Sequence, residues 1–587
     1  MYPITIAAAF RQTVADHPDV VAFSTVDGDL RLTWSALRER VDAFAGGLWE
    51  LGVRPGDAVA AMFTNRPEFN IADLAVVSLG GTGFSLYPSL APEQIAHQLN
   101  NSAARVVVCE RAFLAQLLAA RELAPAVEHL IVLEGGGPAG TLAWADVEAT
   151  ASVVDVAALA AAVAPEDTVT LIYTSGTTGP PKGVELTHFN ITEACKAVNR
   201  GMGLGVGDPV LSWLPNAHIA ERIAHHYLPI INAQTVTTCS DIAQLGDALR
   251  ACRPRWFFSV PRLWEKLKAG VEAQLATLPA AERAAAEAAI AAGVRRVRLE
   301  QAGEPVPAEV AAADATLFAR LRAGLGLDGA AFAHAGGAPS SIDVLEFFNA
   351  IGVPLAELWG MSETCGAGTM GMPARNRIGT VGPASEGVEL RLDTDGELLI
   401  RGPMVTAGYR NQPDETAEAF AADGWFRTGD IATIDADGFV KIVDRKKELI
   451  INAGGKNMSP ANIEAALKSA GPLIGQACVI GDLRPYNVAL LVLDPDTAPA
   501  WAADAGIGVT DAATLATSPA VASALEAEVE QANSRLSRVE QIKRFHLVTE
   551  DWLPGGDELT PTMKLKRKPI AEKYHLAIAA LYERPRT

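Results

Sequence analysis

Short apolar runs alternate with longer stretches of helical period over much of the chain. Each run has the length and composition of a strand buried in a sheet, and several are followed by Ala/Leu-rich segments with a 3.6-residue repeat. Alternation of this kind predicts an α/β architecture with mostly parallel sheets. The predicted strands are Asp57–Phe63, Arg105–Cys109, His129–Leu133, Thr168–Tyr173, Val210–Leu214, Thr235–Cys239 and Trp256–Val260.

The pattern changes twice further along the chain. Residues from about 264 to 324 are rich in Ala, Glu and Arg, which predicts a helical insertion packed on the main body. Beyond Val388, short apolar runs are separated by turn signals that include Asp-Gly pairs at 395–396 and 437–438. Asp-Gly between such runs is a hairpin signal, so we expect an antiparallel subdomain at about 380–443. Its predicted strands are Val388–Leu392, Glu397–Arg401, Ile431–Ile434 and Phe439–Val443.

A charged segment at 444–449 ends this pattern and marks a predicted domain boundary. We expect a large N-terminal domain of parallel and mixed sheets at 1–443 and a smaller C-terminal α+β domain at 450–587. The elements predicted in the smaller domain are the helix Pro460–Ala470, the strands Ala477–Ile480 and Val488–Leu493, and the helix Val521–Leu536.

Composition narrows the class of protein. The chain has 587 residues, and a hydrophobic content of 49% excludes general disorder. Its formal charge of −20 argues against a nucleic acid as the main partner, because such proteins need a basic footprint. The six cysteines show no pairing rhythm and read as reduced thiols. We see neither a secretory leader nor an apolar run long enough to span a membrane, so we expect a cytoplasmic protein.

The segment Leu171–Gly183, LIYTSGTTGPPKG, carries the clearest chemical signal. An apolar strand runs into hydroxyl residues and glycines, and Lys182 follows. Glycines let the backbone approach phosphate oxygens, hydroxyl and N–H groups donate to them, and the lysine adds a positive charge. The segment does not satisfy the Walker A pattern, which disfavours a P-loop kinase.

Other catalytic patterns are absent or weak. The chain has no GxSxG and no HExxH sequence. A GxGxxG match at 135–140 lacks a following βαβ unit and is interpreted as a loop, and the adjacent His225 and His226 as ordinary helix residues. A phosphate loop without an evident protein nucleophile suggests that two substrates react with each other while the protein positions them.

The sequence resembles the adenylate-forming superfamily, which includes acyl-CoA synthetases, adenylation domains and luciferases. The resemblance begins with the signature at Tyr173–Gly183, and five further motifs follow in the family's order. They are Gly336–Pro339, Leu358–Thr364 (LWGMSET), Gly424–Asp430 (GWFRTGD), Asp444–Leu449 (DRKKEL) and Thr560–Lys564 (TPTMK). Within the superfamily, the segments Leu214–Arg222 (LPNAHIAER) and Ser259–Lys266, with the long helical insertion, are similar to long-chain fatty acyl-CoA synthetases.

The resemblance implies ATP-dependent activation of a long-chain fatty acid in two steps. The carboxylate and ATP give acyl-AMP and pyrophosphate, and the thiol of coenzyme A then displaces AMP to give acyl-CoA. Mg²⁺ is the implied metal, and ATP and coenzyme A are co-substrates. The family rotates its small domain about a hinge between the steps, here within 444–449, so we expect a mobile C-terminal domain.

The resemblance also implies roles for individual residues. Glu363 would hold Mg²⁺, Lys564 would reach both the carboxylate and the α-phosphate, Ser362 would donate hydrogen bonds, and His218 would lie on the acyl or pyrophosphate side. A structural role for His218 stays open, and Glu221 and Arg222 are expected to pair with each other. The implied ATP- and AMP-binding residues are Thr174, Ser175, Gly176, Thr177, Thr178, Lys182, Gly336, Gly337, Ala338, Pro339, Trp359, Gly360, Met361, Asp430 and Arg445. The implied hinge residues are Asp444 and Lys447, and the implied coenzyme A-side loop contains Gly454, Gly455 and Lys456.

Three alternatives stay open. A fatty acyl-AMP ligase would deliver the acyl group to a carrier protein; members of that group carry an insertion, and the uninterrupted stretch 379–430 favours a CoA ligase. A ligase for a smaller or aryl acid would share every core motif, although the helical insertion argues against it. A non-enzymatic nucleotide sensor would not need both Glu363 and Lys564. Peripheral contact with the inner face of a membrane is compatible with a fatty acid substrate, but no basic amphipathic helix indicates it.

Overall fold

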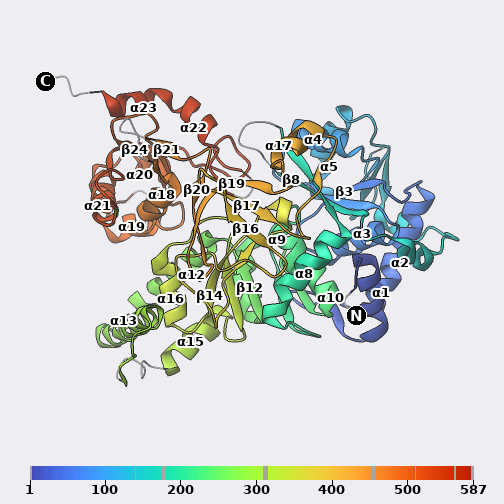
Figure 1. Cartoon of the computed structure of the whole chain (residues 1–587), viewed down its shortest axis with the longest axis horizontal. Helices are drawn as coiled ribbons and strands as arrows, with labels where there is room; N and C mark the ends of the chain where they lie inside the picture. Colours follow the sequence, from blue (N-terminus) through green and yellow to red (C-terminus); the bar gives the residue numbers. More distant parts are fainter. Residues whose placement is uncertain are drawn as a thin grey trace.

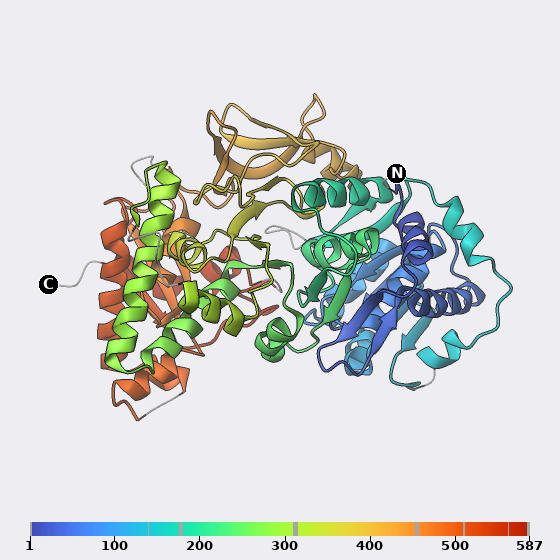
Figure 2. The same cartoon turned by 90° about the horizontal axis from the view of Figure 1, so that it is seen from below.

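The computed structural model of the chain describes residues 3–138, 140–174, 180–308, 315–451, 457–508, 511–560 and 563–583. The N-terminal sheets and the C-terminal part lie at opposite ends of the molecule in both views (Figures 1 and 2). The antiparallel sheet lies between them in Figure 1, and Figure 2 shows that it projects to one side. Within the described ranges no helix is both long and apolar enough to cross a bilayer. The predicted α/β class is confirmed by the sheets described below.

The largest sheet has eight strands in the order β18-β9-β8-β4-β3-β5-β6-β7. The six strands from β8 to β7 pair in parallel, whereas β9 and β18 run antiparallel to their neighbours. Successive residues of β3 (Ala58–Met62) enter two different apolar clusters on the two faces, so every position is buried. Burial on both faces explains why such strands appear in the sequence as continuous apolar runs. The other strands are β4 (Thr82–Ser85), β5 (Val106–Cys109), β6 (His129–Val132), β7 (Thr141–Ala143), β8 (Thr168–Thr174), β9 (Lys182–Thr187) and β18 (Gly408–Tyr409).

Two four-stranded sheets complete the α/β part. In the first, β10 (Pro209–Ser212), β11 (Thr235–Thr238) and β1 (Val21–Thr25) are parallel and β2 (Arg31–Thr33) is antiparallel. In the second, β12 (Trp256–Ser259), β13 (Phe332–Ala335) and β14 (Leu355–Trp359) are parallel and β15 (Thr369–Met370) is antiparallel. All seven predicted strands are present, with ends shifted by one or two residues.

Helices cover these sheets and connect their strands. The stretch expected to form a helical insertion contains α12 (Pro261–Ala276), α13 (Ala280–Ala302) and α15 (Ala315–Leu325), and α12 already starts before residue 264. The other α-helices described in this part are α1 (Ile6–Asp16), α2 (Trp34–Glu50), α3 (Pro67–Ser78), α4 (Pro92–Ser102), α5 (Leu114–Glu122), α6 (Trp144–Glu148), α7 (Val156–Ala162), α8 (His188–Met202), α9 (Ile219–Glu221), α10 (Leu228–Asn232), α11 (Leu245–Cys252) and α16 (Ile342–Ala350).

The antiparallel sheet has the order β16-β17-β19-β20. Both predicted Asp-Gly turns are present, with left-handed φ values of 85° at Gly396 and 84° at Gly438 that glycine adopts without strain. The strands span Glu389–Leu392, Glu397–Arg401, Phe426–Ile434 and Val440–Arg445 in this order, and α17 spans Pro413–Ala419.

The part beyond residue 450 has apolar clusters of its own. Strands β23 (Ile474–Ile480), β24 (Asn487–Leu493) and β25 (Ile542–Val548) form one sheet, and the two clusters on its faces contain only residues from Ile450 onward. A separate core of this kind is expected of a unit that moves as a body. The boundary at 444–449 stays a prediction. The remaining described elements are β21 (Ile450–Ile451), β22 (Asn457–Met458), α18 (Pro460–Lys468), α19 (Ala498–Asp504), α20 (Ala512–Leu515), α21 (Pro519–Arg535), α22 (Arg567–Lys573) and α23 (His575–Tyr582).

Candidate active site

Two neighbouring strands flank the predicted phosphate loop. Thr174 is the last residue of β8 and Lys182 the first of β9, and the two are directly paired in the antiparallel ladder. The hairpin therefore presents the loop at the carboxyl end of a strand of the parallel sheet, where α/β proteins commonly bind ligands. The predicted residues Ser175, Gly176, Thr177 and Thr178 lie outside the described residues.

Glu363 lies in a short 3₁₀ turn, Ser362–Thr364, that follows the end of β14. Its side chain is buried, and the hydroxyl of Tyr409 donates to Oε1 over 2.9 Å. Burial raises the pKa of Glu363, and the Tyr409 hydrogen bond and the charges of Arg445 and Lys182 oppose that shift. A buried carboxylate that accepts hydrogen bonds and faces two cationic side chains is a chemically suitable ligand for a hard divalent ion.

The predicted adenine loop, Gly336–Pro339, connects β13 to α16. A Cβ at Gly336 would lie 2.8 Å from the Leu358 side chain, so only glycine lets the loop pass this close to β14. Gly337, Ala338 and Pro339 are exposed. The carboxylate of Glu357 accepts from the Ser340 N–H over 3.2 Å and holds the end of the loop.

Trp359, Asp430 and Arg445 form the next part of the site. Asp430 and Arg445 are paired residues on β19 and β20. Arg445 Nε lies 2.9 Å from Asp430 Oδ1, and Trp359 Nε1 donates to Oδ2 over 2.8 Å. Burial raises the pKa of Asp430, which these two neighbours oppose. Each carboxylate oxygen has a second lone pair, so both can still accept a hydroxyl proton.

The turn that carries Trp359 onward is closely packed. A Cβ at Gly360 would lie 2.2 Å from the Gly366 carbonyl oxygen, which excludes any other residue there. The Met361 N–H donates to the Thr364 hydroxyl over 3.1 Å and closes the turn around Ser362. Close backbone packing and this hydrogen bond thus hold the predicted residues from Trp359 to Glu363 in place.

Lys564 comes from the C-terminal part, and its charge influences that of Asp430. Its N–H donates to the Thr560 hydroxyl over 3.0 Å, and the Thr560 N–H donates to its carbonyl over 2.8 Å. Enclosure by protein atoms and the Arg445 charge lower the pKa of Lys564, whereas Asp430, Glu448 and Glu363 raise it. Its side chain is nevertheless exposed to solvent.

His218 lies beside this cluster. Burial lowers its pKa to about 4, and the Lys564 charge contributes to the shift. Its Nδ1 accepts from the Ala220 N–H over 3.2 Å and caps a short helical turn. The ring is therefore neutral near pH 7 and carries its proton on Nε2.

The expected pair between Glu221 and Arg222 is wrong. Glu221 accepts instead from His225 Nδ1 over 2.5 Å and from the Leu214 N–H over 3.1 Å. Arg222 pairs with Asp73 over 2.7 Å. Consecutive helical residues project in different directions, which explains the separate partners.

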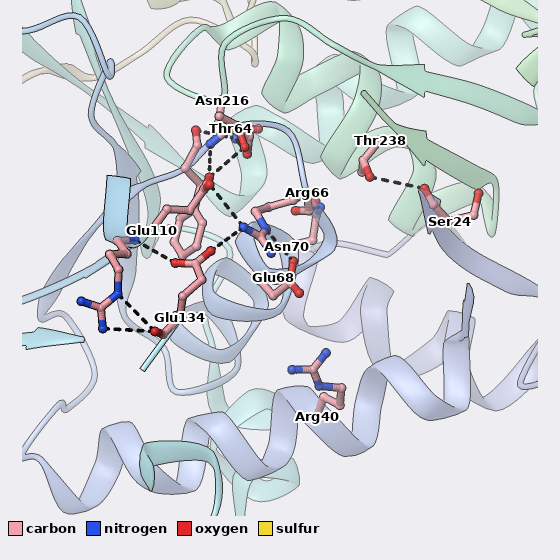
Figure 3. A network of polar contacts seen from close by, with 12 residues as sticks. Ser24, Arg40, Thr64, Arg66, Glu68, Asn70, Glu110, Glu134, Asn216 and Thr238 are labelled. Atoms are coloured by element: carbon pink, nitrogen blue, oxygen red, sulfur yellow. Dashed lines mark hydrogen bonds and ion pairs between the residues drawn. The ribbon is translucent and has the colours of Figure 1, made fainter. Parts of the chain in front are cut away.

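Asn216 anchors the His218 loop to the end of β3. Its side-chain amide donates to the carbonyls of Phe63 and Thr64 over 3.3 and 3.0 Å. Thr64 in turn donates its N–H and hydroxyl to Glu110 over 2.6 and 2.8 Å, and Arg66 lies 3.2 Å from the same carboxylate (Figure 3). These contacts fix the loop against the large sheet.

The predicted hinge carries one buried and one exposed residue. The Asp444 carboxylate accepts from the Ser459 hydroxyl over 2.5 Å and from the Ala461 N–H over 3.2 Å, at the start of α18. Lys447 is exposed, and Gly454, Gly455 and Lys456 lie outside the described residues. Arg567, next to the lysine motif, pairs with Glu464 and Glu448 over 2.6 and 3.0 Å.

Two residues of the site were not foreseen. Tyr409 is 46 positions from Glu363 in the chain, and Glu357 precedes the LWGMSET motif. Burial raises the pKa of Glu357 to about 7, and a buried acid without a cation beside it has no signature in one sequence. Only the paired strands bring these residues to the site.

A strand–loop–strand hairpin, a buried acid, an acid–arginine pair and a lysine from a second unit together define a nucleotide-binding enzyme of the adenylate-forming class. The chain belongs to the AMP-binding enzyme family: the family model matches residues 10–410, and the model of the AMP-binding enzyme C-terminal domain matches residues 447–586. ATP use follows from this membership.

Curated relatives and solved structures agree with this assignment. The putative fatty-acid–CoA ligase fadD11 of Mycobacterium tuberculosis (strain ATCC 25618 / H37Rv) is 47% identical over 450 residues, 76% of this chain and 79% of that protein. The long-chain-fatty-acid–CoA ligase FadD15 of the same strain is 36% identical over 592 residues, 99% of this chain and 97% of that protein. The anthranilate CoA ligase AuaEII in complex with anthranoyl-AMP shares the fold, with a TM-score of 0.73, 19% identity and 98% of each chain covered.

Proposed function

We propose that this protein is an ATP-dependent long-chain fatty acid–CoA ligase that acts through an acyl-AMP intermediate and releases AMP and pyrophosphate. The observation that carries the chemistry is the Asp430–Arg445 ion pair, whose charges act on Lys564 together with that of Glu363. The substrate class rests on the similarity to FadD15 over 99% of this chain. A ligase for smaller acids would share the cleft, so the substrate has to be tested directly.

Adenylation brings a carboxylate up to a negatively charged α-phosphate, and the site has to screen that repulsion. We assign Lys564 to both reacting groups and Lys182, with Thr174, to the terminal phosphates. A preorganised cation aimed at developing charge is worth far more in such a cleft than in water. The Ser362 hydroxyl is assigned as an additional donor.

Glu363 is the residue assigned to Mg²⁺. It fits because its carboxylate is buried, and among the described side chains only the Tyr409 hydroxyl donates to it. When bound, Mg²⁺ would neutralise phosphate charge as a Lewis acid. Asp430 is assigned to the ribose hydroxyls, with Arg445 holding its carboxylate in place.

His218 is assigned as a neutral donor rather than a base. A ring whose pKa is lowered to about 4 does not take up a proton near pH 7, and its Nε2–H can donate to an acyl or phosphate oxygen. For the second step we keep the expectation that the segment 444–449 acts as a hinge and that the loop with Gly454, Gly455 and Lys456 serves the coenzyme A side.

Mass spectrometry of the purified protein with ATP, Mg²⁺ and a mixed panel of short-chain, long-chain and aryl acids, with and without coenzyme A, tests the proposal. Long-chain acyl-CoA formed only when coenzyme A is present is the expected result. Accumulation of acyl-AMP that coenzyme A does not discharge would identify an acyl-AMP ligase instead. A product formed only from aryl or short acids would overturn the substrate class and leave the chemistry intact.

A further inference from the structure

Tyr409 occupies the edge strand that joins two separate pieces of the site. Its strand, β18, has two residues and pairs with β9 in the register Gly408–Glu185 and Tyr409–Val184. The Arg410 N–H donates to the Gly183 carbonyl over 2.8 Å and extends that pairing toward Lys182. The backbone around Tyr409 is therefore fixed to the strand that begins with the phosphate-side lysine.

The same segment is fixed to the turn that carries Glu363. The Thr406 N–H donates to the Glu363 carbonyl over 2.8 Å, and the Thr406 hydroxyl donates to the Glu185 carbonyl over 2.5 Å. A Cβ at Gly408 would lie 2.4 Å from the Thr416 side chain, so the chain between these contacts is tightly packed. Thr406 thus connects the Glu363 turn to β9, and the side chain of Tyr409 makes a second connection between the same two segments.

The side chain of Tyr409 contacts one charged group with each of its two parts. Its hydroxyl donates to Glu363 Oε1 over 2.9 Å, and the Lys182 ammonium lies 4.9 Å from the centre of its ring. A lysine at this distance from an aromatic face makes a cation–π interaction. No carboxylate of the described residues lies within ion-pair distance of Lys182.

This arrangement keeps the Glu363 carboxylate and the Lys182 ammonium apart within one site. If Lys182 and Glu363 met directly, each would neutralise the other, and neither would be available to a phosphate or a metal ion. Tyr409 gives Glu363 a neutral donor and gives Lys182 a neutral aromatic face. Both charged groups then have weak, neutral partners, so a bound ligand can replace these partners at low cost.

We propose that Tyr409 is a positioning residue that separates Glu363 from Lys182 and holds the first for the metal ion and the second for the phosphates of ATP. The inference rests on the proposed function, because the partners of the two charges are Mg²⁺ and ATP. Its two halves reside in different parts of the side chain. The hydroxyl serves the metal side and the ring serves the phosphate side.

Isothermal calorimetry with the non-hydrolysable analogue α,β-methylene-ATP, with and without Mg²⁺, separates the two halves without turnover. In Tyr409→Phe we expect unchanged affinity for the metal-free nucleotide and loss of about tenfold in the enhancement that Mg²⁺ gives, since hydrogen bonds to charged groups are among the stronger ones. In Tyr409→Leu we expect the metal-free affinity to fall as well, by about threefold to tenfold, because the cation–π contact is also lost.

Tyr486→Phe is the matched control, since its hydroxyl donates over 3.0 Å to the Leu581 carbonyl in the C-terminal part. The same variants are assayed for the Mg²⁺ concentration that gives half-maximal adenylation, which should rise only for the Tyr409 variants. Equal metal enhancement in Tyr409→Phe and Tyr486→Phe would overturn the metal half. Equal metal-free affinity in Tyr409→Phe and Tyr409→Leu would overturn the phosphate half. A wild-type protein that binds the nucleotide and activates no acid would overturn the proposed function alone.

Discussion

The two sides of the candidate active site are built in different ways. Glu363, Tyr409 and Lys182 are held by strand pairing and buried hydrogen bonds within the large part of the molecule. Lys564 is held by a turn of the C-terminal part, where Met563 adopts a left-handed φ of 62°. That part lies at the far end of the molecule from the N-terminal sheets (Figure 1). In the proposed function, we expect the first side to stay fixed and bind the nucleotide and the second to withdraw after adenylation.

The fixed side has a buried ion network beneath it. Arg222 Nη2 donates to the Thr170 hydroxyl on β8 and to the Gly83 carbonyl on β4, over 2.7 and 3.3 Å. It also pairs with Asp73, whose other oxygen contacts His226 over 2.8 Å. Arg222 therefore ties the segment after His218 to the strand that leads into the phosphate loop.

Breaking this network should have the largest effect on stability. Arg222→Leu leaves the Asp73 carboxylate buried without its cation, which costs about 3–5 kcal/mol of folding free energy. Thermal unfolding followed by calorimetry should show a first transition lowered by at least about 5 °C. Arg200→Ala removes an exposed ion pair with Glu386 and should change the temperature of this transition by less than about 2 °C. Equal shifts in the two variants would contradict a buried, rigid side.

Removing Lys564 should affect one half-reaction only. Lys564→Ala is expected to lower acyl-AMP formation by about a hundredfold or more, because a preorganised cation is lost from the developing charge. Conversion of supplied acyl-AMP to the thioester should stay within about threefold of wild type, since the second step would use another face of the C-terminal part. Lys568→Ala, an exposed neighbour, is the control. Equal loss in both half-reactions would contradict the assignment of Lys564 to adenylation.

The fold could be predicted where a strand is buried on both faces. The predicted strand Arg105–Cys109 differs from β5 by one residue, because a central parallel strand is a continuous apolar run. β18 escaped prediction because a Gly-Tyr pair becomes a strand only when β9 lies beside it. Its pairing is tertiary, and no local pattern encodes it.

The site shows the same limit. Glu363, Asp430 and Lys564 could be named from motifs, since each motif carries its own residue. The contact between two of the named residues could not: Trp359 donates to Asp430 across 71 positions of the chain. The expected pairing of Glu221 with Arg222 failed for a related reason, because sequence neighbours on a helix point apart.

Glu528 offers a test within the C-terminal part. It is buried on α21, with Oε1 accepting from the Leu473 N–H over 3.2 Å and Oε2 without a described partner. Burial raises its pKa from 4.5 to about 7, so its contribution to stability is fully present below pH 4.5 and is lost as pH rises to about 7.

Glu528→Gln should abolish that pH dependence. Between pH 5 and pH 8 the wild type should lose more stability than the variant, by up to about 3 kcal/mol, and the variant should be the more stable of the two at pH 8. Urea unfolding of the C-terminal part, followed by the fluorescence of Trp501 and Trp552, measures the difference. If the free energy of unfolding depended on pH in the same way in both proteins, the pKa of the Glu528 carboxyl would not be raised in the folded state.

The smallest effect is expected at the ion pairs between the large part of the molecule and the C-terminal part, which carries Lys564. Within the described ranges three such pairs are present: Arg262 with the buried Asp494, Lys266 with Asp496 over 2.5 Å, and Arg535 with Asp343 over 2.9 Å. The last two are exposed and contribute little each, so they can hold one arrangement of the C-terminal part without preventing its release. Salt should weaken them further.

Reversing one charge makes that contact repulsive and should favour withdrawal of Lys564. Lys266→Glu is expected to slow adenylation by about two- to fivefold and to leave the conversion of supplied acyl-AMP unchanged. The second change Asp496→Lys restores the attraction and should restore the rate, because both side chains are exposed and Asp496 has no other ion-pair partner among the described residues. Lys268→Glu on the same helix is the control, since Lys268 pairs with Glu272 and not with the C-terminal part. A double variant as slow as Lys266→Glu would mean that apolar packing, and not this ion pair, holds the two parts together. The C-terminal side would then be as fixed as the side that holds Glu363.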